Sequence, residues 1–224
     1  PEELDGVFLP DNILSLAVSP DTKEVAYLEG RRDATSALVR GTPDGKTRSE
    51  LLRLPLSELL VSWPNESAVT LLSKPSAHAP GYFYEAERGV ANRIIGYVNG
   101  LTALLDSTGG FVLLGTSDRR GYTSALVDRE KGNSRRELPV ATFADKCLWS
   151  RKNPATLYCA VPKGGLGLNQ PDSWYQGLAP LADDLYRIDT ESGAAERLID
   201  ISAEGGREFD ITNLSLDPSE DYLL

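Results

Sequence analysis

Four carboxylate residues each stand shortly before an apolar segment of this 224-residue sequence: Asp11, Glu58, Asp145 and Asp210. Glycosidases use two carboxyl groups, one as general acid and the other as base or nucleophile. Carboxylates gathered at one end of neighbouring strands would suit that chemistry. The alternative is that they are ordinary turn residues whose charges keep the strand ends in contact with water. The apolar segments themselves, at 14–18, 59–62, 101–104, 146–148 and 212–215, contain no Asp or Glu.

Two aromatic residues, Trp174 and Tyr175, stand with Gln176 in a stretch rich in Gly and Pro, where a core would not obviously need them. Exposed aromatic side chains anchor protein partners and stack on sugar rings. A binding role for these three residues is therefore one hypothesis. The other is that Trp174 folds back to plug a channel or to cap the sheet beside it.

Other chemistry finds little support in the sequence. The only histidine, His78, has no clustered carboxylates, so we expect no metal site and no cofactor. The run Lys163–Gly167 lacks the Gly-Lys-Ser/Thr ending of a phosphate-binding loop. No Gly-x-Ser-x-Gly segment marks a serine hydrolase nucleophile.

The two cysteines, Cys147 and Cys159, lie symmetrically about Asn153. In a simple hairpin they would face each other, at a distance that a disulfide can bridge. Two buried free thiols are the alternative. A disulfide would indicate an oxidising, extracytoplasmic compartment.

Net charge argues against two classes of partner. The chain carries −10 at pH 7, with an isoelectric point near 4.7. Nucleic acids and anionic membranes both attract basic surfaces, so neither is expected here. No apolar run reaches the roughly 18–20 residues of a membrane span, so these residues predict no membrane insertion.

The elements that would position these residues follow from a repeated hairpin. Apolar and polar residues alternate through Leu14–Val18, turn at Ser-Pro-Asp, and resume at Val25–Leu28. Four further copies follow, and one turn position is shared by Ser19, Trp63, Asp106, Trp149 and Asp217. The first three intervals are 44, 43 and 43 residues, a period typical of propeller blades.

A second hairpin with a glycine turn completes each of the first four repeats. The first turn and the glycine are 26 residues apart in three repeats (19 to 45, 63 to 89 and 106 to 132) and 44 apart in the fourth (149 to 193). The fourth repeat therefore carries an insertion of 18 residues, 164–181. We expect four antiparallel strands per blade, with blades at about 13–54, 58–96, 100–139, 145–199 and 211–224.

The turn sequences resemble WD40-like propeller repeats of the TolB type, whose signature is Ser-Pro-Asp-Gly between apolar residues. Val18-Ser19-Pro20-Asp21 fits, with Thr22 in the glycine position, whereas Ser62–Asn65 and Leu216–Ser219 fit in part. The fourth repeat and its insertion also resemble uncharacterised exported propellers of candidate-phylum bacteria, which imply no activity. The resemblance implies a propeller fold and does not specify a function. With the five copies of the hairpin, it predicts an all-β, five-bladed propeller.

Antiparallel connectivity places alternate loops on one face. This loop face would hold 30–33, 73–78, the 117–122 loop with Arg119 and Arg120, the insertion, and the long 200–210 loop. A loop that is longer than its counterparts in the other repeats is more often functional than structural. We therefore expect a non-enzymatic, extracytoplasmic scaffold that binds a protein here. The alternative is a propeller that binds or hydrolyses glycans.

The fifth blade is incomplete in this sequence. Its first hairpin reaches only Tyr222–Leu224, and Val7–Leu9 could supply its outer strand. A third strand has no candidate, and an unpaired edge would invite another strand. We expect the natural chain to continue past Leu224.

Overall fold

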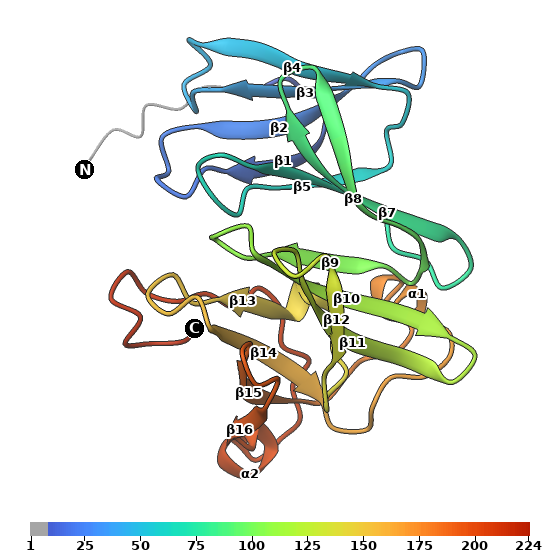
Figure 1. Cartoon of the computed structure of the whole chain (residues 1–224), viewed down its shortest axis with the longest axis vertical. Helices are drawn as coiled ribbons and strands as arrows, with labels where there is room; N and C mark the ends of the chain where they lie inside the picture. Colours follow the sequence, from blue (N-terminus) through green and yellow to red (C-terminus); the bar gives the residue numbers. More distant parts are fainter. Residues whose placement is uncertain (1–8) are drawn as a thin grey trace. The chain divides into compact units, whose positions relative to one another are not determined.

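The computed structural model describes residues 9–224, and its strands form four separate four-stranded antiparallel sheets (Figure 1). In each sheet, the strands lie side by side in chain order. The chain is therefore all-β, and each sheet corresponds to one expected blade. The first two sheets contain β1 (Ile13–Val18), β2 (Val25–Gly30), β3 (Ser36–Gly41), β4 (Arg48–Leu54), β5 (Leu59–Ser62), β6 (Val69–Ser73), β7 (Pro80–Glu87) and β8 (Val90–Asn99).

The third and fourth sheets continue the pattern. They contain β9 (Thr102–Leu105), β10 (Phe111–Asp118), β11 (Gly121–Asp128), β12 (Ser134–Glu137), β13 (Cys147–Trp149), β14 (Thr156–Pro162), β15 (Asp183–Asp189) and β16 (Ala195–Ile199). A short 3-10 helix, η1 (Ala144–Lys146), leads into β13. Two short helices lie in loops of the fourth sheet: α1 (Asp172–Tyr175) and α2 (Ile201–Gly205).

The described residues divide into two compact units. One comprises residues up to 74 with 82–96, and the other comprises 75–81 with 97–224. The first unit has a core shared by its two sheets, in which Leu28 and Leu38 belong to the same buried cluster as Val61 and Leu71. Alternate strand positions supply these side chains, as period-two patterning requires.

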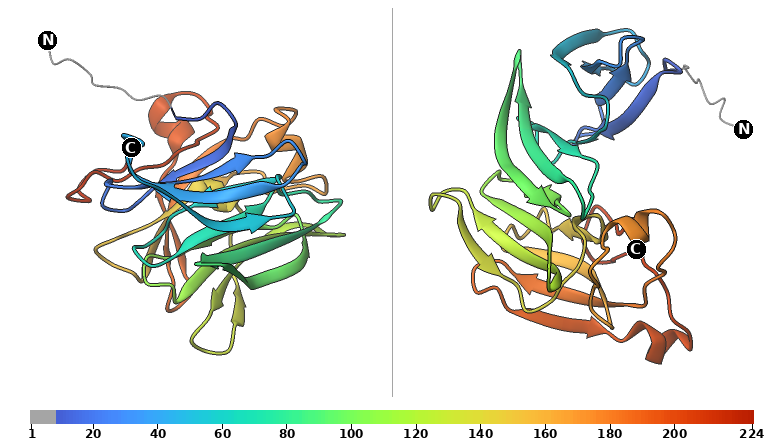
Figure 2. Two further views of the ribbon diagram at one scale, coloured as in Figure 1. Left: turned by 90° about the horizontal axis from the view of Figure 1, so that it is seen from above. Right: turned by 90° about the vertical axis from the view of Figure 1, so that its right-hand side faces the viewer.

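The second unit has its own core, and its two sheets lie face to face in the right-hand view of Figure 2. Leu113 and Leu126 of the third sheet share this core with Leu157 and Ile188 of the fourth. The candidate site described below lies entirely in this unit, at the end of the sheets where η1 begins.

The recurring turn has a common hydrogen-bond pattern in three repeats. The backbone N–H of Ser19, Asp106 and Asp217 donates to the carbonyl five residues later, at 2.9, 2.9 and 3.1 Å. The side-chain oxygen of each residue also accepts the N–H of that later residue, at 2.9, 2.8 and 2.7 Å. The fifth turn is therefore built like the first and the third.

The expected fifth blade contributes only one β-bridge among the described residues, between Leu216 and Leu223. Ser215 and Leu224 exchange two backbone hydrogen bonds beside it, each of 2.8 Å. Of the proposed outer strand 7–9, residues 7 and 8 lie outside the described part of the chain. The count of five blades stays a prediction.

Candidate functional site

The insertion in the fourth sheet is held at its base and at its middle. The Lys163 N–H donates to the Ala182 carbonyl at 2.8 Å, which closes the loop. Within it, both carboxylate oxygens of Asp172 are engaged: one accepts the Ser76 hydroxyl at 2.8 Å and the other accepts the Ala77 N–H at 2.5 Å. The insertion is therefore bonded to the preceding 75–81 segment as well as to its own sheet.

Lys146, the last residue of η1, lies at the centre of a buried polar cluster. Its side chain is 0% exposed, and its ammonium group donates to Asp183 Oδ2 at 2.6 Å, to Asp210 Oδ1 at 2.5 Å and to the Ile211 carbonyl at 2.8 Å. An ammonium group has three donors, so its hydrogen-bonding capacity is filled. The cluster joins η1 to β15 and to the loop that follows α2.

Trp174 connects the insertion to this cluster. Its indole Nε1 donates to Asp210 Oδ2 at 2.9 Å, and its ring lies 5.0 Å from Lys146 Nζ. The ring also packs on buried Phe143, with the ring centroids 5.1 Å apart. Trp174 thus folds back onto the segment that leads into β13, which agrees with the hypothesis that it caps the adjacent sheet.

The pKa values of the two acids bound to Lys146 are shifted in opposite directions. Burial raises the pKa of Asp183 above its usual value, against the opposing effect of the Lys146 hydrogen bond. Desolvation also disfavours the charged form of Asp210, but hydrogen bonds from Lys146, the Leu181 N–H and Trp174 outweigh it and lower its pKa. Asp210 therefore remains an anion that holds the insertion in place.

Tyr175 occupies a second anchor point. Its hydroxyl donates to Asp145 Oδ2 at 2.7 Å, and its ring is 5.1 Å from that of Trp174. Desolvation of the hydroxyl and the nearby Asp145 charge raise the pKa of Tyr175, so the phenol stays protonated and can donate. One side of the ring is thus fixed, while 41% of the residue remains exposed.

The β10–β11 hairpin forms a third attachment. The Tyr122 N–H donates to the Leu166 carbonyl at 3.3 Å. Gly121 has a φ of +125°, and a Cβ there would lie 2.8 Å from the Leu166 oxygen, so the close approach depends on glycine. This contact brings the exposed hairpin tip with Arg119 and Arg120 next to the insertion.

The outer surface of the insertion presents large apolar side chains. Leu168 is 59% exposed and Leu178 is 73% exposed, in addition to the partly exposed Tyr175. Backbone bonds connect their segments, because the Ser173 N–H donates to the Asn169 carbonyl at 3.0 Å and the Leu178 N–H donates to the Ser173 carbonyl at 2.8 Å. We call Leu168, Tyr175 and Leu178 the apolar loop surface.

The other residues predicted from the sequence lie apart from this surface or beside it. Gln176 is exposed and follows α1, whose end its backbone N–H caps. Asp11 and Glu58 are exposed and belong to the first unit, where Glu58 forms an ion pair with Lys74 at 2.5 Å. His78 is exposed, and the described residues contain no group of His, Cys, Asp or Glu suited to a metal ion.

Two central residues of the cluster, Lys146 and Asp183, were missed by sequence reasoning. Nothing in the local pattern separates Lys146 from an ordinary surface lysine. Helix α2, by contrast, has residue types at its two ends that could have predicted it from the sequence. Asp200 is its N-cap and accepts the Ala203 N–H at 3.1 Å, and Gly206 ends the helix with φ +69°.

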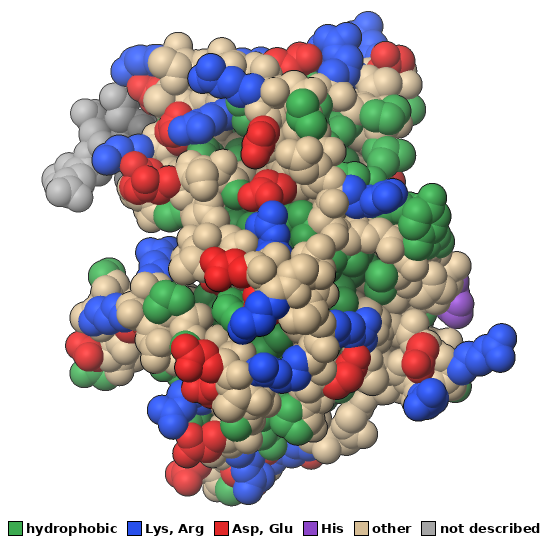
Figure 3. Space-filling view, viewed as in Figure 1, with side chains coloured by type: hydrophobic (Ala, Val, Ile, Leu, Met, Phe, Trp, Pro, Cys, Tyr) green, Lys and Arg blue, Asp and Glu red, His purple; other side chains and the backbone are tan. Residues whose placement is uncertain are grey.

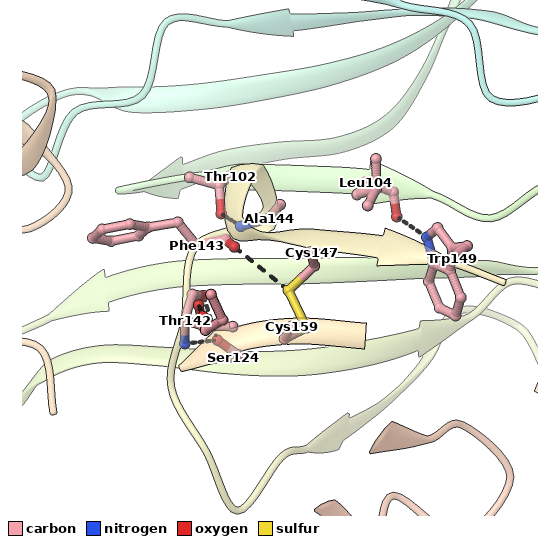
Figure 4. The surroundings of a disulfide bond; sticks show 10 residues. Thr102, Leu104, Ser124, Thr142, Phe143, Ala144, Cys147, Trp149 and Cys159 are labelled. Atoms are coloured by element: carbon pink, nitrogen blue, oxygen red, sulfur yellow. Dashed lines mark hydrogen bonds between the residues drawn. A yellow bond between two sulfur atoms is a disulfide. The ribbon is translucent and has the colours of Figure 1, made fainter. Parts of the chain in front are cut away.

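The predicted disulfide between Cys147 and Cys159 is confirmed (Figure 4). The two residues are direct partners in the register of β13 and β14, with Cα atoms 4.1 Å apart. Figure 4 also shows the Phe143 carbonyl and the Thr102–Ala144 hydrogen bond beside the disulfide. The disulfide therefore lies at the start of β13, directly after Lys146. Among the described residues, no helix is long and apolar enough to cross a membrane.

Comparison with known proteins identifies a fold. No family model and no curated protein matches the sequence. Among solved structures, TolB from Acinetobacter baumannii is similar over 80% of this chain and 41% of its own, with 13% identity and a TM-score of 0.54. An oligogalacturonate lyase in complex with manganese is similar over 96% of this chain and 62% of its own, with 11% identity and a TM-score of 0.60.

A third solved structure, Pyrococcus horikoshii acylaminoacyl peptidase, is similar over 85% of this chain and 33% of its own, with 11% identity and a TM-score of 0.56. This chain thus spans less than two thirds of each of the three proteins. At such identities the likeness shows the fold alone, and that fold serves a lyase and a peptidase as well as TolB. The chain has the TolB-type β-propeller fold, built from four-stranded antiparallel blades.

Proposed function

We propose that this chain is a non-enzymatic module that works outside the cytoplasm and binds a protein partner through the apolar loop surface. The observation that carries the proposal is the contrast between the two sides of one loop. Trp174 and Asp172 are hydrogen-bonded on the inner side, whereas Leu168 and Leu178 are exposed on the outer side. Apolar side chains on an ordered loop favour binding, because little entropy is lost when a partner docks.

The state of the carboxylates favours binding over glycoside hydrolysis. Asp145 accepts the Tyr175 hydroxyl, and Asp210 holds Lys146 and Trp174. Asp183 has a raised pKa, which would suit a general acid, but its side chain is 0% exposed. A glycosidase needs both carboxyl groups within reach of the sugar. The disulfide supports the location, because such bonds persist in oxidising compartments.

The test is a selection of random twelve-residue peptides displayed on phage against the immobilised chain. We expect the wild type to enrich a recurring peptide motif and Leu178→Asp to reduce that enrichment at least tenfold. Leu224→Asp is the matched control, because Leu224 has the same 73% exposure in the same unit. Equal enrichment by Leu178→Asp, or glycan-array binding that requires Leu178, would contradict the proposal.

A further inference from the structure

We propose that the partner presents an acidic segment with apolar side chains, read by the apolar loop surface together with Arg119 and Arg120. This inference rests on the proposed function and adds the chemistry of the partner. It is drawn from two exposed arginine side chains of the second unit, Arg119 and Arg120, whose guanidinium groups have no partner among residues 9–224.

The two arginines lie on a hairpin that is hydrogen-bonded to the insertion, and their guanidinium groups are free to bind. Both are exposed at the tip of the β10–β11 hairpin, and their side chains have no partner among residues 9–224. Figure 3 shows basic side chains with an acidic side chain beside them at the lower right of the molecule. The Tyr122–Leu166 hydrogen bond and the close approach at Gly121 attach the tip to the insertion. The arginines and the apolar side chains therefore belong to connected segments.

The neighbouring acids are engaged within the protein. Asp118 accepts the Arg120 N–H at 2.7 Å, Asp145 accepts the Tyr175 hydroxyl, and Asp172 accepts from Ser76 and Ala77. Asp210 is bonded to Lys146, Trp174 and the Leu181 N–H. These carboxylates keep their negative charge, but their oxygens already accept hydrogen bonds within the protein, whereas the two guanidinium groups still have donors for a partner.

This preference comes from the free guanidinium donors and not from net charge, which is −10 for the whole chain. Interactions between exposed charges are screened beyond about 8 Å at physiological ionic strength, so only the nearest charges act on a docked segment. Guanidinium groups bind carboxylates with two parallel hydrogen bonds, which adds direction to the attraction. Apolar contact with Leu168 and Leu178 would supply the remaining affinity.

The experiment compares the composition of the peptides selected by three forms of the whole chain. Wild type should enrich peptides with Asp or Glu beside Leu, Phe or Trp. Arg119→Glu/Arg120→Glu should still enrich apolar peptides but should replace the acids with Lys or Arg. Arg32→Glu/Arg88→Glu changes the net charge equally, at exposed arginines of the first unit, and should select the same acidic peptides as wild type.

A synthetic peptide from the wild-type selection then serves as the probe. Its dissociation constant should rise at least tenfold for Arg119→Glu/Arg120→Glu and should rise with added salt in the wild type. Two results would contradict an acidic partner: neutral or basic consensus peptides from the wild type, or an unchanged preference for acidic peptides in Arg119→Glu/Arg120→Glu. Neither result would contradict binding at the apolar loop surface. A consensus that survives Leu178→Asp would overturn the proposed function itself.

Discussion

Lys146 joins three parts of the candidate site through one buried ammonium group. Its ammonium group is buried, and it neutralises carboxylates from β15 and from the loop after α2. Burying charges is costly, and such a cluster is tolerated only when each charge keeps its partner. In this cluster the bonds also position Asp210, which accepts the Trp174 indole. The stability of the cluster and the position of the insertion are therefore linked.

Replacing Lys146 tests that link. Lys146→Met would leave the buried Asp183 carboxylate without its cation, and we expect a loss of about 3–5 kcal/mol in the free energy of unfolding. The double variant Lys146→Met/Asp183→Asn should recover part of the loss, because it removes the buried charge as well. Urea denaturation of the three proteins measures both effects. A change below about 0.5 kcal/mol in Lys146→Met, the scale of ordinary surface substitutions, would show that the cluster is not required.

Among the elements of the fold, the strands follow from the sequence pattern, whereas the short loop helices do not. Alternating residues and constant turn offsets located the four-stranded sheets, and symmetric counting gave the Cys147–Cys159 register. The same offsets located the insertion but not its structure. α1 has four residues, too few for a helical period, and its contacts with Ser76 and Phe143 join distant parts of the sequence.

The disulfide between β13 and β14 gives a prediction for these elements. Intact protein should take up no alkylating reagent until a reductant is added, as mass spectrometry can measure. Reduction should lower the free energy of unfolding by about 2–3 kcal/mol, because the bond closes a short loop in the unfolded chain. The sequence separation of the two residues is 12. Two thiols that react without reductant would show that the bond is absent in solution.

Helix α2 gives a pH-dependent prediction at its N-cap, Asp200. Hydrogen bonds from Lys163, from the Ala203 N–H and from Ser202 lower the pKa of Asp200. A lowered folded-state pKa means that the stabilisation is present above the unfolded value of about 3.9 and is lost as the pH falls toward the folded value. Asp200→Asn keeps an equally good cap but removes the charge.

We therefore expect Asp200→Asn to unfold at lower urea concentration than the wild type near about pH 7, where the unfolded-state carboxyl is ionised. The difference in unfolding urea concentration between wild type and Asp200→Asn should become smaller as the pH falls below about 3.9. A difference that is constant across this range would mean that the ion pairs with Lys163 and Arg197 contribute nothing.

For the molecule as a whole, the sequence repeat predicted the fold class, but the candidate site could be recognised only in the structure. Four sheets follow the four complete repeats, and the fifth turn reproduces the hydrogen bonds of the first and third. The Lys146 cluster joins residues 146, 183 and 210, and no period of the sequence relates these positions. The apolar loop surface could not be predicted either, because the sequence does not reveal which side of a loop is hydrogen-bonded to the rest of the protein and which side faces solvent.

The proposed function requires the insertion to be an ordered docking surface rather than a flexible connection. Amide hydrogen exchange of the full chain, read for 173–181 by mass spectrometry, tests this requirement most directly. The N–H groups of Ser173, Gln176, Leu178 and Leu181 are hydrogen-bonded, so this segment should exchange at least a hundredfold more slowly than an unstructured peptide. Exchange at the rate of an unstructured peptide would contradict the proposed function, because the apolar side chains would then have no fixed arrangement to offer a partner.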